Sequence, residues 1–210
     1  MARYLGPREK VERRVGERLF LKGDRSYSPK AAVTRRPYPP GQHTRRNNKI
    51  SEFGQQLMAK QKVRATYRML EKQFKNGIKH ALESREEPYT EIIGKLENRL
   101  DNTVFRSGFA QSRDQARQLV SHGHILVNGK KVNIPSYTVK RNDIISVREG
   151  SKKTKYFTTL LPVWFPAYQG PGWIEINKEK VEAKVKGQAT LEESGLKMED
   201  LQAVVEYYSR

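Results

Sequence analysis

The sequence contains no cysteine, which excludes disulfide bonds and thiolate zinc sites. It also lacks a long apolar segment: the richest patch, LLPVWFPAY at residues 160–168, contains two prolines and is far shorter than the roughly 20 residues that span a bilayer. The first ten residues, MARYLGPREK, do not form the apolar run of a secretory signal. We therefore expect neither a membrane-spanning helix nor a secreted, disulfide-bonded protein.

Acidic residues are scarce relative to basic ones. The 210-residue chain has 41 Lys and Arg but 23 Asp and Glu, which gives a net charge of +18. Because self-repulsion destabilises a compact state, this excess predicts a polyanionic partner. Nucleic acid fits best. An anionic membrane surface is the second candidate, and the lack of an apolar anchor disfavours it, so we predict no membrane partner.

The positive charge is concentrated near the amino terminus. Residues 1–50 contain 14 basic and 4 acidic side chains, whereas residues 151–210 contain 9 and 8. The stretch RRPYPPGQHTRRNNK at 35–49 combines arginines with rings that can stack on unpaired bases and with prolines that limit backbone freedom. We interpret residues 1–50 as a basic arm held by RNA, with a solvated flexible tail as the alternative.

The arm should contain one short helix. Pro7 is suited to open it, and Val11, Val15 and Leu19 repeat at intervals of four along one face until Gly23 stops it.

A second helix is predicted from the N-cap Ser51 to Asn76, where Gly77 stops it. Its apolar stripe consists of Val63, Tyr67, Leu70 and Phe74. The adjacent face carries four cations, Lys60, Arg64, Arg68 and Lys72. Like charges at this spacing repel one another, so we interpret them as a phosphate-facing ridge, with an ordinary solvated helix face as the alternative.

The central region predicts two helices followed by a small sheet. The first has Leu96, Leu100 and Val104 on one face and ends near Gly108, with Arg99 and Arg106 on another face. The second begins at a capping box, S-x-x-Q, formed by Ser112 and Gln115, and closes at His122 and Gly123.

Arg113 and Arg117 lie four residues apart at the start of this helix. We expect them to project together and, with the backbone N–H groups of the helix start, to form an anion site. Asn128-Gly129 then predicts a type I′ hairpin turn, with Lys130 and Lys131 at the exposed tip. A further strand is expected at 143–147.

Several motifs in this region resemble a known RNA-binding domain. They are R-L-D at 99–101, S-R at 112–113, Q-L-V-S-H-G-H-I at 118–125, V-N-G-K at 127–130 and N-I-P-S-Y at 133–137. Together they resemble the domain named after ribosomal protein S4 of the small subunit. MARYLGP, RRPYPPGQH, LPVWFP, GWIEIN and VVEYYSR resemble the bacterial and organellar S4 family itself, so the resemblance covers essentially the whole chain.

The resemblance implies an α+β fold. In this fold a basic arm at 1–50 precedes a mostly helical domain at 51–92, which residues 186–210 complete. An RNA-binding domain at 93–185, with its core motif at 98–160, is inserted between these two segments.

The resemblance also implies a structural role in the small ribosomal subunit: direct binding to 16S-type ribosomal RNA, nucleation of assembly and, with ribosomal protein S5, a contribution to translational accuracy. Other small-subunit proteins and the protein's own messenger RNA are further implied partners. The expected location is the ribosome of a bacterial cytoplasm, with an organellar ribosome as the alternative.

The sequence departs from the family pattern at two points. Some members hold zinc with cysteines near the amino terminus, and that site cannot exist here. Asn142 precedes Asp143 where the family often has glycine. Because asparagine tolerates a left-handed backbone better than most residues, we expect the turn to be kept.

Competing functions find less support. Neither G-x-x-x-x-G-K-[ST] nor G-x-G-x-x-G occurs, and the chain has no room for the catalytic domain of a pseudouridine synthase, so we predict no enzyme and no cofactor. His122 and His124 lack a third ligand, so we predict no metal. A DNA-binding helix-turn-helix is the more serious rival, although a lysine-tipped hairpin and stacking rings fit an irregular RNA surface better.

These patterns and the resemblance together nominate one set of RNA-binding side chains. They are Arg3, Arg13, Arg14, Arg18, Arg35, Arg36, Tyr38, His43, Arg45, Arg46, Lys49, Lys60, Arg64, Arg68, Lys72, Arg99, Arg106, Ser112, Arg113, Arg117, His122, His124, Lys130, Lys131, Lys140 and Arg141.

Overall fold

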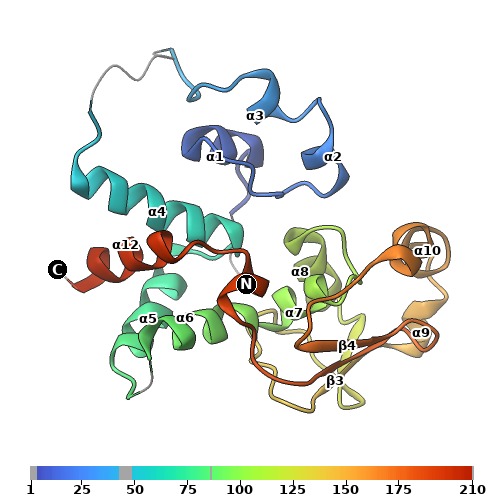
Figure 1. The fold of residues 1–210 in the computed structure, drawn as a ribbon. Coiled ribbons are helices and arrows are strands. Elements are labelled where there is room, and N and C mark those ends of the chain that lie inside the picture. Colours follow the sequence, from blue (N-terminus) through green and yellow to red (C-terminus); the bar gives the residue numbers. More distant parts are fainter. Residues whose placement is uncertain (1–3, 43–48, 86, 210) are drawn as a thin grey trace. The chain divides into compact units, whose positions relative to one another are not determined.

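The computed structural model describes residues 4–42, 49–85 and 87–209 (Figure 1). It divides into two compact units: one comprises Met1–Ile92 and Gly195–Arg210, the other Ile93–Ser194. The first unit is helical in its described part, and the second combines helices with a small antiparallel sheet. The predicted α+β class is therefore confirmed. No helix within the described ranges is long and apolar enough to cross a membrane.

The amino-terminal part of the first unit contains the short helices α1 (Arg8–Val15), α2 (Asp24–Tyr27) and α3 (Ala32–Arg35). Pro7 is the N-cap of α1, as predicted, but the helix ends at Gly16, whose φ is 87°. The predicted stop at Gly23 is therefore wrong, because the left-handed glycine turns the chain seven residues earlier. Leu19 is nevertheless buried: it forms a small apolar cluster, against which α1 packs, with Leu21, Ala65, Val11 and Val15.

A buried carboxylate organises this turn. Glu12 is 3% exposed, and its Oε1 accepts hydrogen bonds from the backbone N–H groups of Leu19 (3.3 Å) and Leu21 (3.2 Å). A buried donor without an acceptor costs about 1–3 kcal/mol. We expect Glu12→Leu to lower the free energy of unfolding by at least that amount in urea denaturation. Glu12→Gln, whose amide oxygen can still accept, should lose less. Equal stability of the leucine variant and the wild type would contradict this role.

Helices α4 (Glu52–Thr66) and α5 (Glu71–Leu82) stand where one helix was predicted. The N-cap is confirmed, since the Ser51 hydroxyl accepts from the N–H of Gly54 at 3.2 Å. The continuation to Asn76 is wrong, because Arg68 adopts a φ of 55° and the chain turns. This turn buries both Tyr67 and Met69, two side chains that would lie on opposite faces of an uninterrupted helix. Gly77, the predicted stop, lies inside α5.

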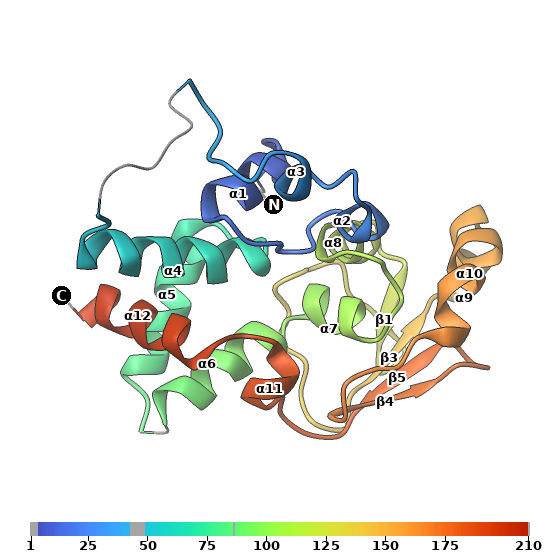
Figure 2. The ribbon, with the colours of Figure 1, turned by 45° about the horizontal axis from the view of Figure 1, so that its top comes forward.

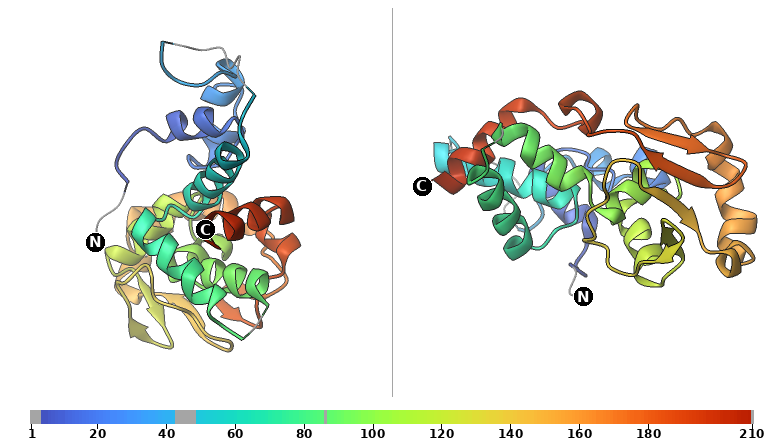
Figure 3. Two further views of the ribbon diagram at one scale, coloured as in Figure 1. Left: turned by 90° about the vertical axis from the view of Figure 1, so that its left-hand side faces the viewer. Right: turned by 90° about the horizontal axis from the view of Figure 1, so that it is seen from below.

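The carboxyl-terminal helix α12 (Met198–Ser209) belongs to the same unit and packs along α4 and against α5 (Figures 1 and 3). Leu201 and Val204 are fully buried and form the apolar face of this helix. Lys62 Nζ lies 2.7 Å from carboxylate oxygens of both Glu17 and Asp200. Burial alone would lower the pKa of Lys62, but these two carboxylates raise it above its ordinary value. Apolar packing and a paired charge therefore both fix α12.

Three helices begin the second unit or lead into it: α6 (Pro88–Glu97), α7 (Leu100–Arg106) and α8 (Arg113–Ser121). Leu96, Leu100 and Val104 are buried, as predicted, but the helix expected to carry them all is interrupted. The interruption lies at Arg99, whose backbone pairs with that of Thr138 in an isolated antiparallel bridge. The capping of α8 is confirmed, because Ser112 Oγ accepts from the N–H of Gln115 at 3.3 Å.

The sheet of the second unit consists of β1 (Ile125–Val127), β2 (Lys130–Lys131), β3 (Ile144–Val147), β4 (Ile174–Asn177) and β5 (Glu182–Val185). Within the described residues these strands follow the order β2-β1-β3-β5-β4, all antiparallel (Figure 2). The predicted hairpin is confirmed, since Asn128 and Gly129 both have positive φ, 50° and 76°. Asn142 keeps the expected left-handed turn with a φ of 71°.

A helical segment connects β3 to β4. It contains α9 (Glu149–Lys152), the π-helical turn η1 (Tyr156–Leu160), α10 (Leu161–Trp164) and the 3-10 turn η2 (Phe165–Ala167). Phe157, Leu161 and Phe165 are buried, and the Tyr156 hydroxyl donates to the backbone carbonyl of Phe109 at 2.8 Å. The two strands that follow this segment, β4 and β5, were not predicted from sequence patterns, and they complete the sheet.

Candidate nucleic-acid interface

A basic pocket lies among α1, α2 and α3 of the first unit. It has a volume of about 220 Å³ and also contacts Pro7 and Ala32. Its charged lining, in the part of the chain that the structure describes, is Glu9, Lys10, Arg13, Arg25, Lys30, Arg35 and Arg36. We call this site the amino-terminal basic pocket. Of its cations, only Arg13, Arg35 and Arg36 were nominated from the sequence, so the pocket brings these three together.

Arg13 ties the proline-rich segment to α1. Its Nε donates to the backbone carbonyls of Arg36 (3.2 Å) and Tyr38 (3.1 Å), and its guanidinium lies 4.8 Å from the centroid of the Tyr38 ring. Nη2 reaches the carbonyl of Pro39 at 3.4 Å. The described start of the segment 35–49 is therefore held by its own chain, which the sequence did not predict. The prolines add to this restraint by limiting the backbone.

The pocket retains unneutralised positive charge. Its acid, Glu9, is already paired, with Lys22 Nζ at 3.2 Å and Arg25 Nε at 2.9 Å. Four other side chains of the lining are exposed and make no hydrogen bond or ion pair with any described residue: Lys10, Lys30, Arg35 and Arg36. Several unpaired cations around one concave site favour binding of an anion with several charged groups.

Other nominated arm residues differ in their surroundings. Arg14 and Arg18 are exposed, and Arg18 Nη2 donates to Thr34 Oγ1 at 2.7 Å. Lys49 is exposed. Four nominated residues lie outside the described part of the chain: Arg3, His43, Arg45 and Arg46.

The predicted cationic ridge at 60–72 does not form, because α4 ends at Thr66. Lys60 is buried, with Nζ 2.9 Å from Glu71 Oε1. Burial alone would raise the pKa of Glu71, but its hydrogen bonds with Lys60 and Tyr208 lower that pKa.

The two arginines of this set are also engaged within the unit. Arg64 Nη1 donates to the carbonyl of Met69 at 3.3 Å, and Arg68 Nη2 donates to the carbonyl of Tyr4 at 3.2 Å. Lys72, by contrast, is exposed on α5. Three of the four cations that periodicity assigned to an outer face are therefore engaged in contacts within the unit.

Two arginines of the second unit converge on one buried carboxylate. Arg99 Nη2 lies 2.8 Å and Arg117 Nη1 3.3 Å from Asp101 Oδ2, and Arg99 Nε donates to Oδ1 at 3.0 Å. Arg117 is 4% exposed, so the prediction that it projects beside Arg113 is wrong. Helix α7 places Asp101 against the inner face of α8, and the carboxylate draws Arg117 inward.

Glu97, which is 0% exposed, forms a second buried pair. Arg106 donates to both of its carboxylate oxygens, at 2.9 Å from Nε and 2.8 Å from Nη2. Asn102 Nδ2 donates to Glu97 Oε2 at 2.7 Å, and Asn102 Oδ1 accepts from Arg113 Nε at 2.8 Å. These contacts join α6, α7 and α8, so Arg106 and Arg113 serve the packing of the helices.

The exposed nominated residues of the second unit lie at or next to its turns. They are His122, Lys130, Lys131, Lys140 and Arg141. His124 is half-buried; its Nδ1 lies 2.9 Å from Ser151 Oγ. Burial is the largest cause that lowers the pKa of His124, and the neighbouring His122, Arg148 and Lys131 lower it further. The charged form of this imidazole is therefore disfavoured, which makes it a weaker partner for a phosphate. Among the described residues no group of three or more His, Cys, Asp or Glu side chains is placed so that it could hold a metal ion.

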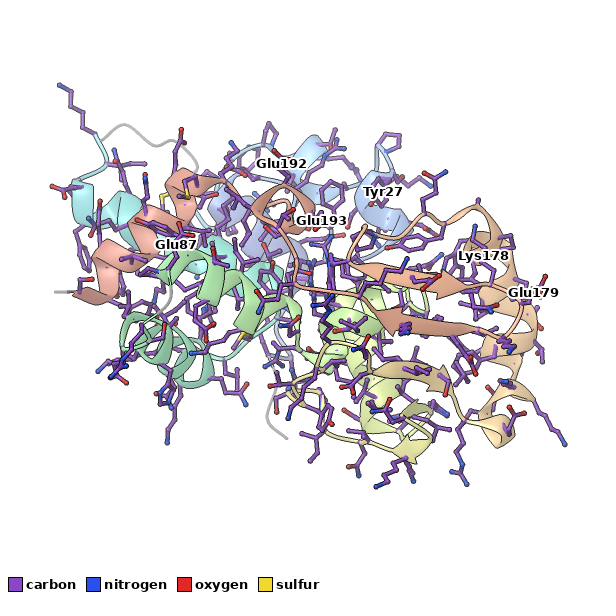
Figure 4. The ribbon with its side chains drawn as sticks, turned by 60° about the horizontal axis from the view of Figure 1, so that its bottom comes forward. Tyr27, Glu87, Lys178, Glu179, Glu192 and Glu193 are labelled. Carbon is purple, nitrogen blue, oxygen red and sulfur yellow. The ribbon has the colours of Figure 1, made fainter. Side chains whose placement is uncertain are left out.

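One cavity of the second unit has the wrong charge for RNA. It measures about 620 Å³ beside β3, β4 and β5, and its charged lining is Glu175, Lys178, Glu179, Glu182 and Lys184. Figure 4 shows Lys178 and Glu179 side by side at the turn between β4 and β5. Because acids balance the lysines, a phosphate gains little there.

The geometry can be set beside known proteins. Residues 3–104 match the family model of the ribosomal protein S4/S9 N-terminal domain, and residues 98–145 match that of the S4 domain. The chain is 48% identical to the small ribosomal subunit protein uS4 of Halothermothrix orenii and to that of Syntrophobacter fumaroxidans. It is 46% identical to the uS4 of Thermotoga maritima. Each comparison covers all 210 residues of this chain and the full length of the relative. The chain therefore belongs to the uS4 family of small ribosomal subunit proteins, which are structural components and not enzymes.

Proposed function

We propose that the protein is a structural constituent of the small ribosomal subunit and binds small-subunit ribosomal RNA directly. Membership of the uS4 family supports the setting. The observation that carries the RNA contact is the amino-terminal basic pocket, where the side chains of Lys10, Lys30, Arg35 and Arg36 have no partner among the described residues. RNA supplies the closely spaced phosphates that such a site requires.

The arrangement of the pocket favours tight binding. Arg13 holds the backbone at Arg36 and Tyr38, so part of the segment is ordered before RNA arrives. Prior order reduces the conformational entropy that binding would otherwise cost. Lys130, Lys131, Lys140 and Arg141 extend the contact through the second unit.

Finer roles rest on the resemblance to the family. We propose that the protein nucleates assembly of the subunit and, with ribosomal protein S5, contributes to translational accuracy. Other small-subunit proteins and its own messenger RNA complete the proposed partners. The place of action is the ribosome of a bacterial cytoplasm, as the bacterial sources of the relatives support.

The experiment that tests the function is a binding titration against salt. If the protein neutralises six to ten phosphates, its affinity for a folded ribosomal RNA junction should fall roughly 10³- to 10⁵-fold between 50 and 200 mM salt, by analogy with duplex DNA. Filter binding at several salt concentrations measures this slope. Duplex DNA of equal length is the control, since a helix-turn-helix reader would prefer it. A flat salt response, or tighter binding to the duplex, would contradict the proposal.

A further inference from the structure

A second concave site lies on the second unit and shares no lining residue with the glutamate-lined cavity. It measures about 550 Å³ and is lined by Asn98, Thr138, Val139, Lys140, Arg141, Gly187 and Gln188. We call it the amide groove. Its volume is within the range of sites for small ligands, about 300–1,000 Å³. Of its residues, sequence patterns nominated only the two cations.

Backbone hydrogen bonds fix both walls of the amide groove. On one side the N–H of Val139 donates to the carbonyl of Asn98 at 2.8 Å, next to the bridge between Arg99 and Thr138. On the other side the N–H of Lys186, one residue before Gly187, donates to the carbonyl of Trp173 at 2.8 Å. The backbone at or beside both walls is therefore held before a ligand binds.

The side chains of the groove offer two kinds of chemistry. Lys140 and Arg141 are exposed and have no side-chain partner within the described residues. The nearby acid, Asp143, is already engaged: Oδ2 accepts from the backbone N–H of Lys140 and Oδ1 from Asn128 Nδ2, both at 2.8 Å. The described lining contains no acidic side chain, in contrast to the glutamates of the larger cavity.

The amides distinguish this groove from a simple phosphate site. Asn98 and Gln188 each present a donor and an acceptor, and their side chains make no hydrogen bond with any described residue. The hydroxyl of Thr138, also in the lining, adds a third polar group. A primary amide can form two hydrogen bonds with the edge of a base, by donating one and accepting the other. A phosphate in the RNA backbone cannot pair in this way, because its oxygens only accept. No aromatic side chain occurs in the described lining, so base edges, and not stacking, would be read.

We propose that the amide groove binds one unpaired nucleotide of the RNA: Lys140 and Arg141 hold its phosphate, and the amides of Asn98 and Gln188 read the edge of its base. The inference rests on the proposed function, because it assumes an RNA partner. RNA-binding proteins read sequence mostly in single-stranded loops and bulges, where base edges are accessible. The groove therefore selects a base, whereas the amino-terminal basic pocket binds backbone charge.

The test compares loss of amides with loss of charge in the full-length protein. Asn98→Ala/Gln188→Ala should weaken binding to a ribosomal RNA junction about fivefold or more, the loss expected for one amide–base pair. Its salt slope should not change, since no charge is removed. Lys140→Ala/Arg141→Ala should reduce the slope by about two. Gln169→Ala and Lys153→Ala/Lys155→Ala are the matched controls, because these residues are exposed in the same unit.

The outcomes separate this inference from the proposed function. Wild-type affinity and its salt slope test RNA binding as such. If the wild type binds with a steep slope but Asn98→Ala/Gln188→Ala and the single variant Gln188→Ala bind as tightly as Gln169→Ala, the amides read no base and the inference fails alone. Loss confined to Lys140→Ala/Arg141→Ala would show a phosphate site only and would also overturn the base-reading role.

Discussion

Asp101→Ala is expected to lower the free energy of unfolding of the second unit by about 3–5 kcal/mol, the usual cost of removing one partner of a buried ion pair. The carboxylate is buried between Arg99 and Arg117, each of which is also almost fully buried. Its removal takes away the carboxylate that both guanidinium groups contact in a poorly solvated site. Both tryptophans, Trp164 and Trp173, lie in this unit, so urea denaturation followed by intrinsic fluorescence measures its unfolding.

The control for Asp101→Ala is a change of charge at the surface of the same unit. Arg141→Ala removes an exposed guanidinium and should change stability by no more than about 0.5 kcal/mol. A second test is Arg117→Ala, which should destabilise the unit because it removes one of the two buried cations that contact Asp101. If Asp101→Ala and Arg117→Ala were both as stable as Arg141→Ala, the buried network would have no structural role. Because Arg117→Ala is expected to destabilise the unit, weaker RNA binding by this variant must be corrected for the fraction of unfolded protein.

The features that the sequence predicted correctly have local causes. Ser51 and Ser112 each cap a helix. In each cap the hydroxyl oxygen of the serine accepts from the backbone N–H group three residues later. Asn128-Gly129 and Asn142 adopt positive φ because their side chains tolerate it. At each position the determining interaction falls within one turn of the chain, so no knowledge of tertiary contacts is needed.

The errors share a cause that lies outside any local window. Arg117 was assigned to an outer face, but Asp101, sixteen residues earlier, draws it inward. Lys60 was placed on a ridge, yet it is buried against Glu71 because the chain turns at Arg68. None of the residue types at 66–69 predicts such a turn. Helical periodicity identifies which side chains share a face; it does not identify which face a tertiary partner will cover.

The same limit applies to the candidate site. The charge of the arm was evident from composition, and so was its preference for a polyanion. Lys10 and Lys30 were not nominated, because only the packing of α1 against α3 places them beside Arg35 and Arg36. An acid-free run from Arg25 to Ser51 was the available signal for Lys30.

Replacing Lys10, Lys30, Arg35 and Arg36 together by alanine is expected to make the salt dependence of RNA binding much shallower. Each cation that contacts a phosphate adds about one unit to the slope of log affinity against log salt, so the slope should fall by about four. Binding to a ribosomal RNA junction, titrated from 50 to 300 mM salt, measures the change. Stability should be unaffected, because these side chains have no partner among the described residues.

The decisive comparison is with a variant that loses the same charge elsewhere. Lys153, Lys180, Lys184 and Lys186 are exposed in the nearly neutral carboxyl-terminal part of the chain, and their replacement by alanine should leave the slope close to that of the wild type. If both variants lost slope equally, net charge alone would attract the RNA and the pocket would have no special role. Arg13→Lys sharpens the test, because it keeps the charge but cannot reproduce the guanidinium bonds to the carbonyls of Arg36 and Tyr38. A prearranged pocket requires this variant to bind RNA more weakly than the wild type, whereas a site that depends only on the sum of its charges requires equal affinity.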